Sequence, residues 1–381
     1  MKLLYYSPSS YGGLADYAHE QANALAEIGV DVHFLCTPEY PAHKASKYRR
    51  MAELEEVNLD TTAAHKIARA RQYLRVTLNN YRSLANTIRR GSYQYVLLSA
   101  YAEYFAPLWA GQFRRLAKQG VTFGAVVHDP VRDFVLGPIW WHKWSVAQGY
   151  SFLRNVFVHE QVAIDYGTRA DCIRTTVISH GVYNFLDAQR SRLSVRKALN
   201  VPEQAKVMLS FGHIRDGKNL DLIIRAMVEL PDVYLVVAGK EQSSGQRAAE
   251  YYQALAERLN VAERCRWQIG FISKSLAADL LSASDVVALT YSRDFRSASG
   301  VLTVAANYQK QCIASGGEGS LKTLVTKYHL GTWVEPDSWE AIQEGIKQHF
   351  LHPPSSLWRE FYAENSWLAN AQQVAKFLEA S

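Results

Sequence analysis

The stretch VMLSFGHIRDGKNLDLIIRAM (207–227) contains the unit on which the expected fold is built. Its apolar run is typical of a buried strand and ends at Gly212, where a polar turn begins. An apolar pattern of helical period follows the turn. A strand, a tight turn and a helix in this order are the building unit of parallel α/β sheets.

The same rhythm recurs along the whole chain. In the front half, strands are expected at 2–6, 30–36, 95–99, 123–128, 155–159 and 175–179, with helical patterns such as 14–29 between them. The back half repeats the rhythm at 207–212, 233–239, 266–271, 285–291, 311–315 and 331–335. Because the alternation occurs twice, the sequence predicts an α/β protein with two doubly wound, parallel-sheet, Rossmann-like domains.

The chain length fits two domains, and one polar segment separates them. The 381 residues suit two domains of ordinary size. The segment DAQRSRLSVRKALNVPEQAK (187–206) has no strand pattern and is expected to be the linker. We therefore predict an N-terminal domain over 1–190 and a C-terminal domain over 200–350.

Composition indicates a globular protein of a reducing compartment. The hydrophobic fraction is 48% and the charged fraction 20%, which excludes a largely disordered chain. The four cysteines, Cys36, Cys172, Cys265 and Cys312, are far apart, which argues against a disulfide scaffold and a zinc site. The first apolar run is too short for a signal peptide, and no stretch of 18 apolar residues occurs. We expect a cytoplasmic protein without a transmembrane helix.

The net charge of +6 is concentrated in the front half. Up to residue 190 there are 21 Lys and Arg against 16 Asp and Glu, and beyond it 21 against 20. Basic segments lie at 44–50, 66–75 and 113–118. This basic excess fits three kinds of partner: an anionic membrane surface, an anionic small substrate or nucleic acid. It also fits a helix face that is simply exposed to solvent. The segments contain no recognised nucleic-acid module, which argues against nucleic acid.

The polar turn after the strand 207–212 is the strongest candidate for a binding site. Ligands of parallel sheets bind at the carboxyl ends of strands, and this turn carries His213, Arg215 and Lys218 there. Several cationic groups at a helix start suit a diphosphate. A solvated basic loop is the alternative interpretation.

A second anion site is expected where a helix follows the strand 285–291. Ser299, Gly300 and Val301 open that helix, whose first N–H groups are free to bind an anion. A serine N-cap on an ordinary helix fits the same pattern. The glycine-rich loop 315–320 is either a lid or a turn.

Two further candidate sites, both in the front half, also lie where an expected strand ends. Gly12 and Gly13 precede a helix expected to begin near Leu14, and they suit either close approach of a ligand or a plain turn. His128 ends a strand, where it could act as a base or donate a hydrogen bond to a sugar hydroxyl. His159 is a second candidate of the same kind. A structural role for these histidines is the alternative.

Taken in order, these clusters resemble the family 4 glycosyltransferases of the GT-B fold. The resemblance covers nearly the whole chain. It rests on YGG (11–13), VISHGV (177–182), FGHIRDGKN (211–219), GFIS (270–273), ASDVVALTYS (283–292), QCIASGG (311–317) and FYAENSWLANAQQVAKFLE (361–379). It implies that C-terminal helices over 355–381 cross back to the N-terminal domain, which binds the acceptor.

The resemblance implies a role for each cluster in the back half. Lys218 matches the family's diphosphate-binding lysine, His213 takes the position of its arginine partner, and Arg215 lies close enough to substitute. Gly270 and Phe271 match the backbone that meets the nucleobase.

Further roles follow for the second anion site and the front half. The backbone of 299–301 matches the amides that hold the phosphates, Gly12 and Gly13 match the front glycine loop, and His128 matches a histidine near the donor sugar. The family usually has two glutamates seven residues apart, at the sugar and the ribose. Here Phe295 and Thr303 stand near those positions, so both contacts depart from the family pattern.

The implied function is that of a retaining hexosyltransferase in polysaccharide or exopolysaccharide assembly. It would move a sugar from a UDP- or GDP-sugar to a glycan or lipid-linked saccharide acceptor, with His128 and Lys218 as catalytic residues. No metal is expected, because no DxD-like acidic pair follows a strand. The alternatives are a nucleotide-sugar epimerase and a degenerate member that binds nucleotide or glycan without turnover.

The aromatic stretch FVLGPIWWHKWSVAQGYSF (134–152) adds to the basic front half. Trp and Tyr favour the depth of lipid headgroups, so the stretch and the basic segments suit peripheral binding at the inner face of a membrane. An aromatic cleft that holds a sugar ring is the alternative.

Overall fold

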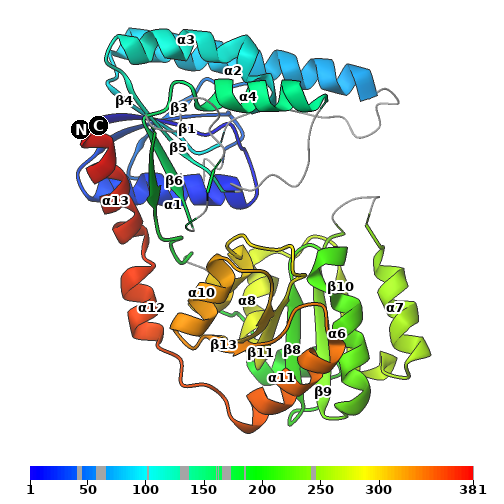
Figure 1. The fold of residues 1–381 in the computed structure, drawn as a ribbon. Coiled ribbons are helices and arrows are strands. Elements are labelled where there is room, and N and C mark those ends of the chain that lie inside the picture. Colours follow the sequence, from blue (N-terminus) through cyan, green and yellow to red (C-terminus); the bar gives the residue numbers. More distant parts are fainter. Residues whose placement is uncertain are drawn as a thin grey trace. The chain divides into compact units, whose positions relative to one another are not determined.

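The computed structural model describes residues 1–40, 45–56, 66–100, 103–128, 137–159, 161, 163–164, 173–183, 186–241 and 246–380. The chain forms two compact units. The first consists of Met1–Gly181 with Asn365–Ser381, and the second of Val182–Glu364. Figure 1 shows a sheet with helices on both of its faces in each unit.

The first unit is built on a parallel sheet with the strand order β3-β2-β1-β4-β5-β6-β7. Its strands are β1 (Lys2–Tyr6), β2 (Asp31–Cys36), β3 (Arg49–Ala52), β4 (Tyr95–Leu98), β5 (Thr122–Val126), β6 (Asn155–Val158) and β7 (Arg174–Val177). Tyr6 pairs in register with Leu35 of β2 on one side and with Leu98 of β4 on the other. The chain therefore winds outward from β1 to β3 and then crosses back to start again beside β1.

Helices cover both faces of this sheet because its strands are apolar on both sides. In β1, Leu4 and Tyr6 face the core under α2 (Lys66–Gly91), α3 (Ala106–Lys118) and α4 (Ile139–Tyr150). Leu3 and Tyr5 face the core under α1 (Gly13–Glu27) and α13 (Trp367–Glu379). The alternation is the two-residue period of a strand buried on both faces.

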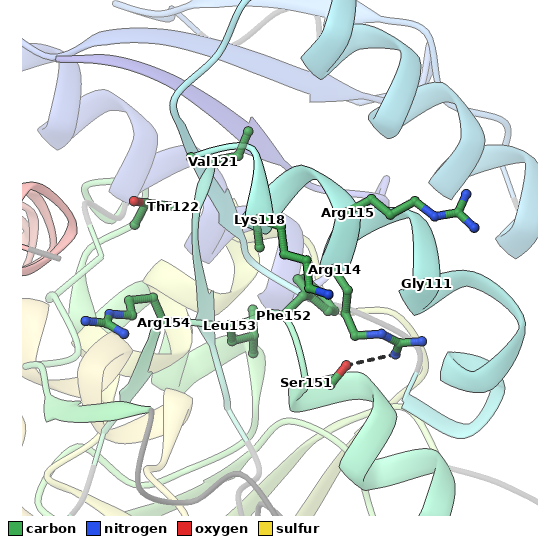
Figure 2. A pocket seen from close by; sticks show the side chains of 12 residues that line it. Gly111, Arg114, Arg115, Lys118, Val121, Thr122, Ser151, Phe152, Leu153 and Arg154 are labelled. Atoms are coloured by element: carbon green, nitrogen blue, oxygen red, sulfur yellow. Dashed lines mark hydrogen bonds between the residues drawn. The ribbon is translucent and has the colours of Figure 1, made fainter.

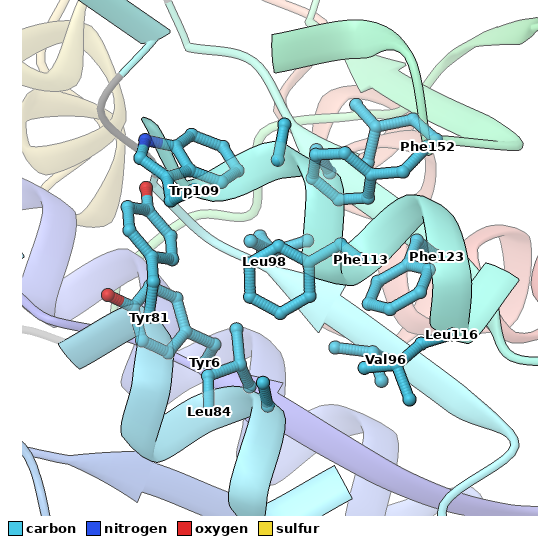
Figure 3. Close-up of a cluster of buried hydrophobic side chains, with 14 of the residues drawn as sticks. Tyr6, Tyr81, Leu84, Val96, Leu98, Trp109, Phe113, Leu116, Phe123 and Phe152 are labelled. Carbon is cyan, nitrogen blue, oxygen red and sulfur yellow. The ribbon is translucent and has the colours of Figure 1, made fainter. Parts of the chain in front are cut away.

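Aromatic rings fill the core beneath α2, α3 and α4 (Figure 3). The ring of Tyr81 stacks on that of Trp109 with 4.0 Å between centroids, and Phe113 meets Phe123 edge to face at 5.7 Å. Both arrangements are favoured geometries for aromatic pairs. The first pair joins α2 to α3, and the second holds α3 against the beginning of β5.

The second unit has a parallel sheet with the order β10-β9-β8-β11-β12-β13. Its strands are β8 (Lys206–Phe211), β9 (Val233–Gly239), β10 (Cys265–Ile269), β11 (Val286–Thr290), β12 (Cys312–Ser315) and β13 (Gly331–Trp333). Its helices are α5 (Arg192–Ala198), α6 (Leu220–Ala226), α7 (Ala249–Arg258), α8 (Lys274–Ala283), α9 (Gly300–Asn307), α10 (Ser320–Lys327), α11 (Trp339–Leu351) and α12 (Trp358–Glu364). Each sheet reverses its winding direction once, at β1/β4 and at β8/β11.

The segment 187–206, expected as a linker, contains α5 and belongs to the second unit. The Arg196 side chain is 2% exposed and its guanidinium pairs with the Asp285 carboxylate at 2.7 Å. The Arg190 guanidinium pairs likewise with Asp279 of α8, also at 2.7 Å. The polar composition suggested a linker, but these arginines pair with carboxylates of the second unit.

The predicted fold class is confirmed: every expected strand is present, and both sheets are parallel. Strand β3 was not expected, because two of its four residues, RRMA, are arginines and it lies at the sheet edge beside β2. Within the described parts of the chain, no helix is long and apolar enough to cross a membrane. Cys36, Cys265 and Cys312 are buried free thiols, and Cys172 lies outside the described residues.

Candidate functional site

The turn after β8 begins at a glycine that no other residue could replace without strain. Gly212 has a φ of +93°, a left-handed conformation. A side chain on the neighbouring Gly239 would place its Cβ 1.9 Å from the Gly212 carbonyl oxygen. A Cβ on Gly212 itself would lie 3.2 Å from the Lys218 Nζ and 3.5 Å from a Val301 methyl. Gly239 thus lets the end of β9 lie against the β8 turn, and Gly212 lets that turn lie close to the start of α9.

Lys218 ends a single 3-10 turn, η3 (Asp216–Lys218), and folds back onto the strand. Its Nζ donates a hydrogen bond of 2.6 Å to the carbonyl oxygen of Phe211, the last residue of β8. Burial, and then the nearby Arg215, lower the pKa of Lys218 to about 7. The side chain is only partly exposed, so an anion that reached it would meet a poorly hydrated cation.

Arg215 and His213 complete a group of three cationic side chains in this turn. The Arg215 guanidinium lies 5.8 Å from the ring centroids of both Tyr291 and Phe295, which stack on each other at 4.0 Å. The His213 side chain is exposed, and desolvation followed by the charges of Lys218, Arg215 and Lys240 lowers its pKa. Arg215 is therefore the permanent charge of the turn, and a bound anion would favour protonation of Lys218 and His213.

The one carboxylate of the turn does not neutralise these cations. Asp216 accepts a hydrogen bond of 2.9 Å from the Arg247 side chain and one of 3.1 Å from the Tyr252 hydroxyl. Burial opposes its ionisation, but the Arg247 hydrogen bond lowers the pKa of Asp216. A second carboxylate, Asp221, pairs with the same guanidinium at 3.0 Å. Asp216 and Asp221 thus both pair with Arg247.

The N-terminus of α9 lies against this turn and carries the second predicted anion site. Ser299 caps the helix by accepting a hydrogen bond of 3.3 Å from the Leu302 N–H, and its hydroxyl also meets the Tyr291 hydroxyl at 3.0 Å. A Cβ added to Gly300 would have no atom within 4 Å. Both interpretations of the sequence are therefore compatible: the serine is an N-cap, and the space beside Gly300 is open.

Thr303 and Phe295 stand where the resemblance places two glutamates. Their side chains make contacts within the second unit instead. The Thr303 side chain is 2% exposed, and its hydroxyl donates to the Gly300 carbonyl oxygen at 2.8 Å within the helix. Phe295 supports Tyr291, and the Gly317 N–H donates to its carbonyl oxygen at 2.8 Å. The loop 315–320 is thus packed against the segment after β11. The structure gives neither residue a polar group directed at the turn.

Gly270 and Phe271 follow β10 at the same carboxyl edge of the sheet. Gly270 has a φ of +126°, and its N–H donates to the Gly239 carbonyl oxygen at 2.9 Å. The Phe271 side chain is 89% exposed. An exposed aromatic ring next to a fixed backbone is a suitable surface for a flat base.

In the first unit, Gly12 and Gly13 form an open entry to α1. The helix begins at Gly13, one residue before the expected start, and Gly12 has a φ of +80°. A Cβ on either residue would have no atom within 4 Å. The open space fits the close approach of a ligand, and the contact itself stays a prediction.

His128 belongs to a buried group of rings that the sequence showed only in part. Its ring meets Tyr17 edge to face at 4.5 Å, and His159 and His180 meet the same tyrosine at 5.2 and 5.3 Å. Burial, and then the His180 charge, lower the pKa of His128 to about 3. His180 was missed as a partner, although it stands in VISHGV (177–182), one of the motifs of the resemblance.

The hydrogen bonds of these histidines set their tautomer. The His128 ring bonds the backbone of Ser99, and the Nδ1 of His159 lies 3.3 Å from the Ile178 carbonyl oxygen. The Nε2 atoms of both rings are buried without a partner among the described residues. Nδ1 therefore donates to the backbone, and Nε2 is left as an acceptor. Of the two roles expected from the sequence, an unprotonated Nε2 suits a base, or an acceptor from a sugar hydroxyl, better than a donor.

Comparison with known families gives one match in the second unit. The profile of the family described as "Glycosyl transferases group 1" matches residues 191–362. The D-inositol 3-phosphate glycosyltransferase of Mycobacterium marinum is 28% identical over 220 residues, which are 56% of this chain and 46% of that protein. The Mycobacterium tuberculosis protein of the same name is 30% identical over 179 residues, 44% of this chain and 36% of its own length. The chain thus spans about half or less of these curated relatives.

Solved structures match over the whole chain. A glycosyltransferase from Rickettsia africae aligns with a TM-score of 0.68 at 15% identity, covering 100% of this chain and 98% of that one. The Anabaena protein HepE, solved in complex with UDP, aligns with a TM-score of 0.69 at 15% identity and covers 100% of both chains. These likenesses establish the architecture. Residues 191–362 are thus similar to the glycosyl transferases group 1 family, and the chain has the GT-B fold.

Proposed function

We propose that the protein is a retaining glycosyltransferase that moves a sugar from a UDP- or GDP-sugar to a glycan or lipid-linked saccharide in polysaccharide assembly. One observation carries the proposal. Lys218, Arg215 and His213 gather at the carboxyl end of β8, beside the open N-terminus of α9. The permanent cation Arg215, two basic groups that a bound anion would help to protonate, and a helix N-terminus are together complementary to a diphosphate.

The same group would stabilise the charge that develops on the leaving diphosphate. Lys218 is held in place before the reaction by the Phe211 carbonyl oxygen, and Arg215 by the rings of Tyr291 and Phe295. Groups that are already oriented toward developing charge need no reorganisation during the reaction. In this proposal the side chains and the amides of Gly300 and Val301 carry the charge balance.

We assign His128 to the donor sugar, as the acceptor of a hydroxyl hydrogen bond. Its Nε2 is buried and unpartnered among the described residues, and a buried acceptor without a partner is costly unless a ligand supplies one. The exposed ring of Phe271 would receive the base. UDP is the first nucleotide to test, because HepE was solved with UDP and with UDP-glucose.

Two alternatives remain in competition with transfer. A nucleotide-sugar epimerase needs acidic residues around the sugar, and the buried Thr303 and the stacked Phe295 stand where the family has glutamates. The same departure favours a degenerate member that binds nucleotide without turnover as the second candidate.

A thermal-shift panel with UDP, GDP, ADP and their sugars tests the proposal. A nucleotide at 100 times its Kd stabilises the native state by about 2.7 kcal/mol. We expect UDP or GDP to raise the melting temperature, and the matching nucleotide-sugar to be consumed with release of free nucleotide. Nucleotide binding without consumption would support the degenerate member, and binding of none of them would contradict the proposal.

We further propose that the first unit docks on an anionic membrane surface. A pocket of about 760 Å³ at the end of α3 is lined by Arg114, Arg115, Lys118 and Arg154 (Figure 2). Arg114 is held by Ser151 at 3.0 Å, while Arg115 in the same view extends away from the other labelled side chains. A lipid phosphate would meet several cations at once, each worth about 1 kcal/mol near an anionic surface.

Exposed aromatic side chains on the helix next to this pocket support the same proposal. In α4, Ile139 is 64%, Trp140 63% and Trp144 46% exposed, and Leu108 of the adjacent α3 is 55% exposed. Large apolar side chains exposed on two neighbouring helices are typical of an interaction surface. The tryptophans would lie at headgroup depth.

Vesicle co-sedimentation decides this second part. We expect the protein to pellet with vesicles that contain phosphatidylserine at low salt and to be released as salt shortens the Debye length to about 8 Å. Replacement of Trp140 and Trp144 by Ala should weaken pelleting at every salt concentration. Absence of pelleting at low salt would leave a solvated basic face and a soluble acceptor.

A further inference from the structure

A cleft of about 400 Å³ lies in the first unit where its sheet reverses winding direction. Tyr6, at the end of β1, and Ala100, just after β4, both line it. The crevice between two strands that wind in opposite directions, outside their carboxyl ends, is where open α/β sheets bind ligands. The position alone therefore predicts a binding site, independently of the cationic turn in the second unit.

Aromatic rings form the floor and the rim of this cleft. Tyr6 and Tyr81 are 2% and 1% exposed and stack with 5.8 Å between their centroids (Figure 3). Tyr11 and Tyr73 are 83% and 37% exposed. The exposed rings offer apolar faces to a ligand, and the buried pair keeps the floor rigid. Flat apolar faces with a polar tip are the usual platforms for sugar rings, whose C–H bonds are apolar and whose edges carry hydroxyls.

The polar groups of the cleft are hydroxyls, an amide and one carboxylate. Ser10 donates a hydrogen bond to Glu56, and Thr77 and Asn80 line the wall formed by α2. Glu56 is the only charged side chain among the described lining residues, which include no Lys, Arg or His. An ionised carboxylate accepts hydrogen bonds from ligand hydroxyls and repels a ligand phosphate or carboxylate.

We infer that this cleft holds an uncharged saccharide of the acceptor, stacked on Tyr73 and hydrogen-bonded to Glu56, and that it discriminates against phosphorylated or acidic sugars. The inference rests on the proposed function and names the acceptor class. The charge of the cleft is opposite to that of the β8 turn and of the pocket in Figure 2. A diphosphate and an acceptor would thus be sorted by charge.

The first test is saturation-transfer NMR on the whole chain in saturating UDP, which fills the nucleotide site. The neutral probes are cellobiose, maltose and lactose, and the anionic probes are glucose 6-phosphate and glucuronic acid. We expect transfer to at least one neutral disaccharide and none to the anionic sugars. Tyr73→Ala should raise the Kd of the neutral sugar by up to about tenfold, because one exposed stacking face is lost. Tyr251→Ala, at a tyrosine of α7 that is 40% exposed and lies outside the cleft, is the matched control and should leave that Kd unchanged.

A change of charge at Glu56 gives the sharper test. Glu56→Gln should raise the Kd of neutral sugars severalfold and abolish the discrimination against anionic sugars. Glu56→Lys should make glucose 6-phosphate the probe that binds best. A wild-type protein that binds glucose 6-phosphate better than the neutral sugars would overturn the inference. So would a neutral-sugar Kd that Tyr73→Ala leaves unchanged.

The UDP affinity of the same samples separates the two proposals. Normal UDP binding without any binding of neutral sugars would contradict this inference and leave the proposed function standing. Binding of neutral sugars without binding of UDP or GDP would contradict the proposed function and leave the cleft as a saccharide site.

Discussion

At the turn after β8, Lys218 exchanges much of its hydration for a single hydrogen bond to the Phe211 carbonyl oxygen. We expect Lys218→Ala to fold normally and to reduce turnover of the nucleotide-sugar by about 10²–10³-fold, the usual loss when one preoriented charge contact is removed. Steady-state release of nucleotide measures the effect. Lys347→Ala, at an exposed lysine of α11, is the control. Equal rates in wild type and Lys218→Ala would remove Lys218 from the site.

The low pKa of Lys218 makes nucleotide binding depend on pH. In the free protein Lys218 titrates near pH 7, because burial disfavours its charge. A bound diphosphate favours the charged form and raises this pKa, so binding above pH 7 takes up a proton. We expect the UDP affinity to fall between pH 7.5 and 9, by up to about tenfold per pH unit.

Calorimetry in HEPES and Tris at one pH measures that proton uptake, because the two buffers differ in ionisation enthalpy. The uptake should disappear in Lys218→Ala. An affinity that stays flat between pH 7.5 and 9 would show that the ammonium is charged throughout and does not couple to the ligand.

At the residue scale, the sequence predicted the cations of the turn but not what holds them. Lys218 and Arg215 stand out because they follow a strand and a glycine. The rings under Arg215 belong to the segment after β11, which is distant in sequence, and the pairing of Asp216 depends on Arg247, 31 residues further on. Local spacing contains no signal for such contacts, because they are fixed by how the sheet brings separate loops together.

At the element scale, α9 presents an N-terminus whose first residue has no neighbour in the space where a side chain would stand. Gly300→Ala should leave the free energy of unfolding unchanged or slightly raised, since Ala favours a helix. It should weaken UDP binding at least about tenfold if the phosphates approach the helix amides closely, as helix N-termini permit. Titration calorimetry gives the affinity.

Gly111→Ala in α3 is the matched control, because its Cβ would make only an ordinary contact of 3.6 Å with Arg114. It should not change the UDP affinity. Unchanged UDP affinity in Gly300→Ala as well would place the phosphates elsewhere.

Elements with an apolar pattern were predictable, and elements without one were not. Strands such as β9, VYLVVAG, are found from their own residues because burial on both faces requires a continuous apolar run. β3 is held by its pairing with β2, and α5 by ion pairs such as Arg196–Asp285. Their stability comes from partners distant in sequence, so their own residues predict a loop or a linker.

At the scale of the whole molecule, α13 belongs to the first unit although 183 residues of the second precede it in the chain. Its Leu378 is fully buried against the same core as Leu3 and Tyr5. Leu378→Ala should lower the free energy of unfolding of the first unit by about 2–5 kcal/mol through the lost contacts and the remaining cavity.

Scanning calorimetry with and without UDP can assign that loss. UDP should raise the melting temperature of the second unit, and Leu378→Ala should lower the melting temperature of the first unit. The exposed Leu368 of the same helix supplies the control, since Leu368→Ala should change stability by no more than about 0.5 kcal/mol. A Leu378→Ala protein whose UDP-sensitive transition falls instead would contradict the division into these two units.

The two-domain plan was predictable because the strand–helix rhythm occurs twice. The return of α13 was not contained in that rhythm: it was expected only from the resemblance to family 4 glycosyltransferases. Its docking depends on single contacts such as Asn370, whose amide donates to the Ser179 carbonyl oxygen at 2.7 Å and accepts from Gln21 at the same distance. These contacts join residues far apart in the chain, so no local sequence pattern predicts the docking of α13.

The late position of α13 has a consequence for how the protein is made on the ribosome. At about 5–20 residues per second, translation of the second unit occupies roughly 10–40 s. Throughout that interval the first unit lacks Ala371, Val374 and Leu378, and the groove under α1 that they fill is open to water. A nascent chain with an apolar groove exposed for so long is a natural client for chaperones, and the first unit matures only after the second has left the ribosome.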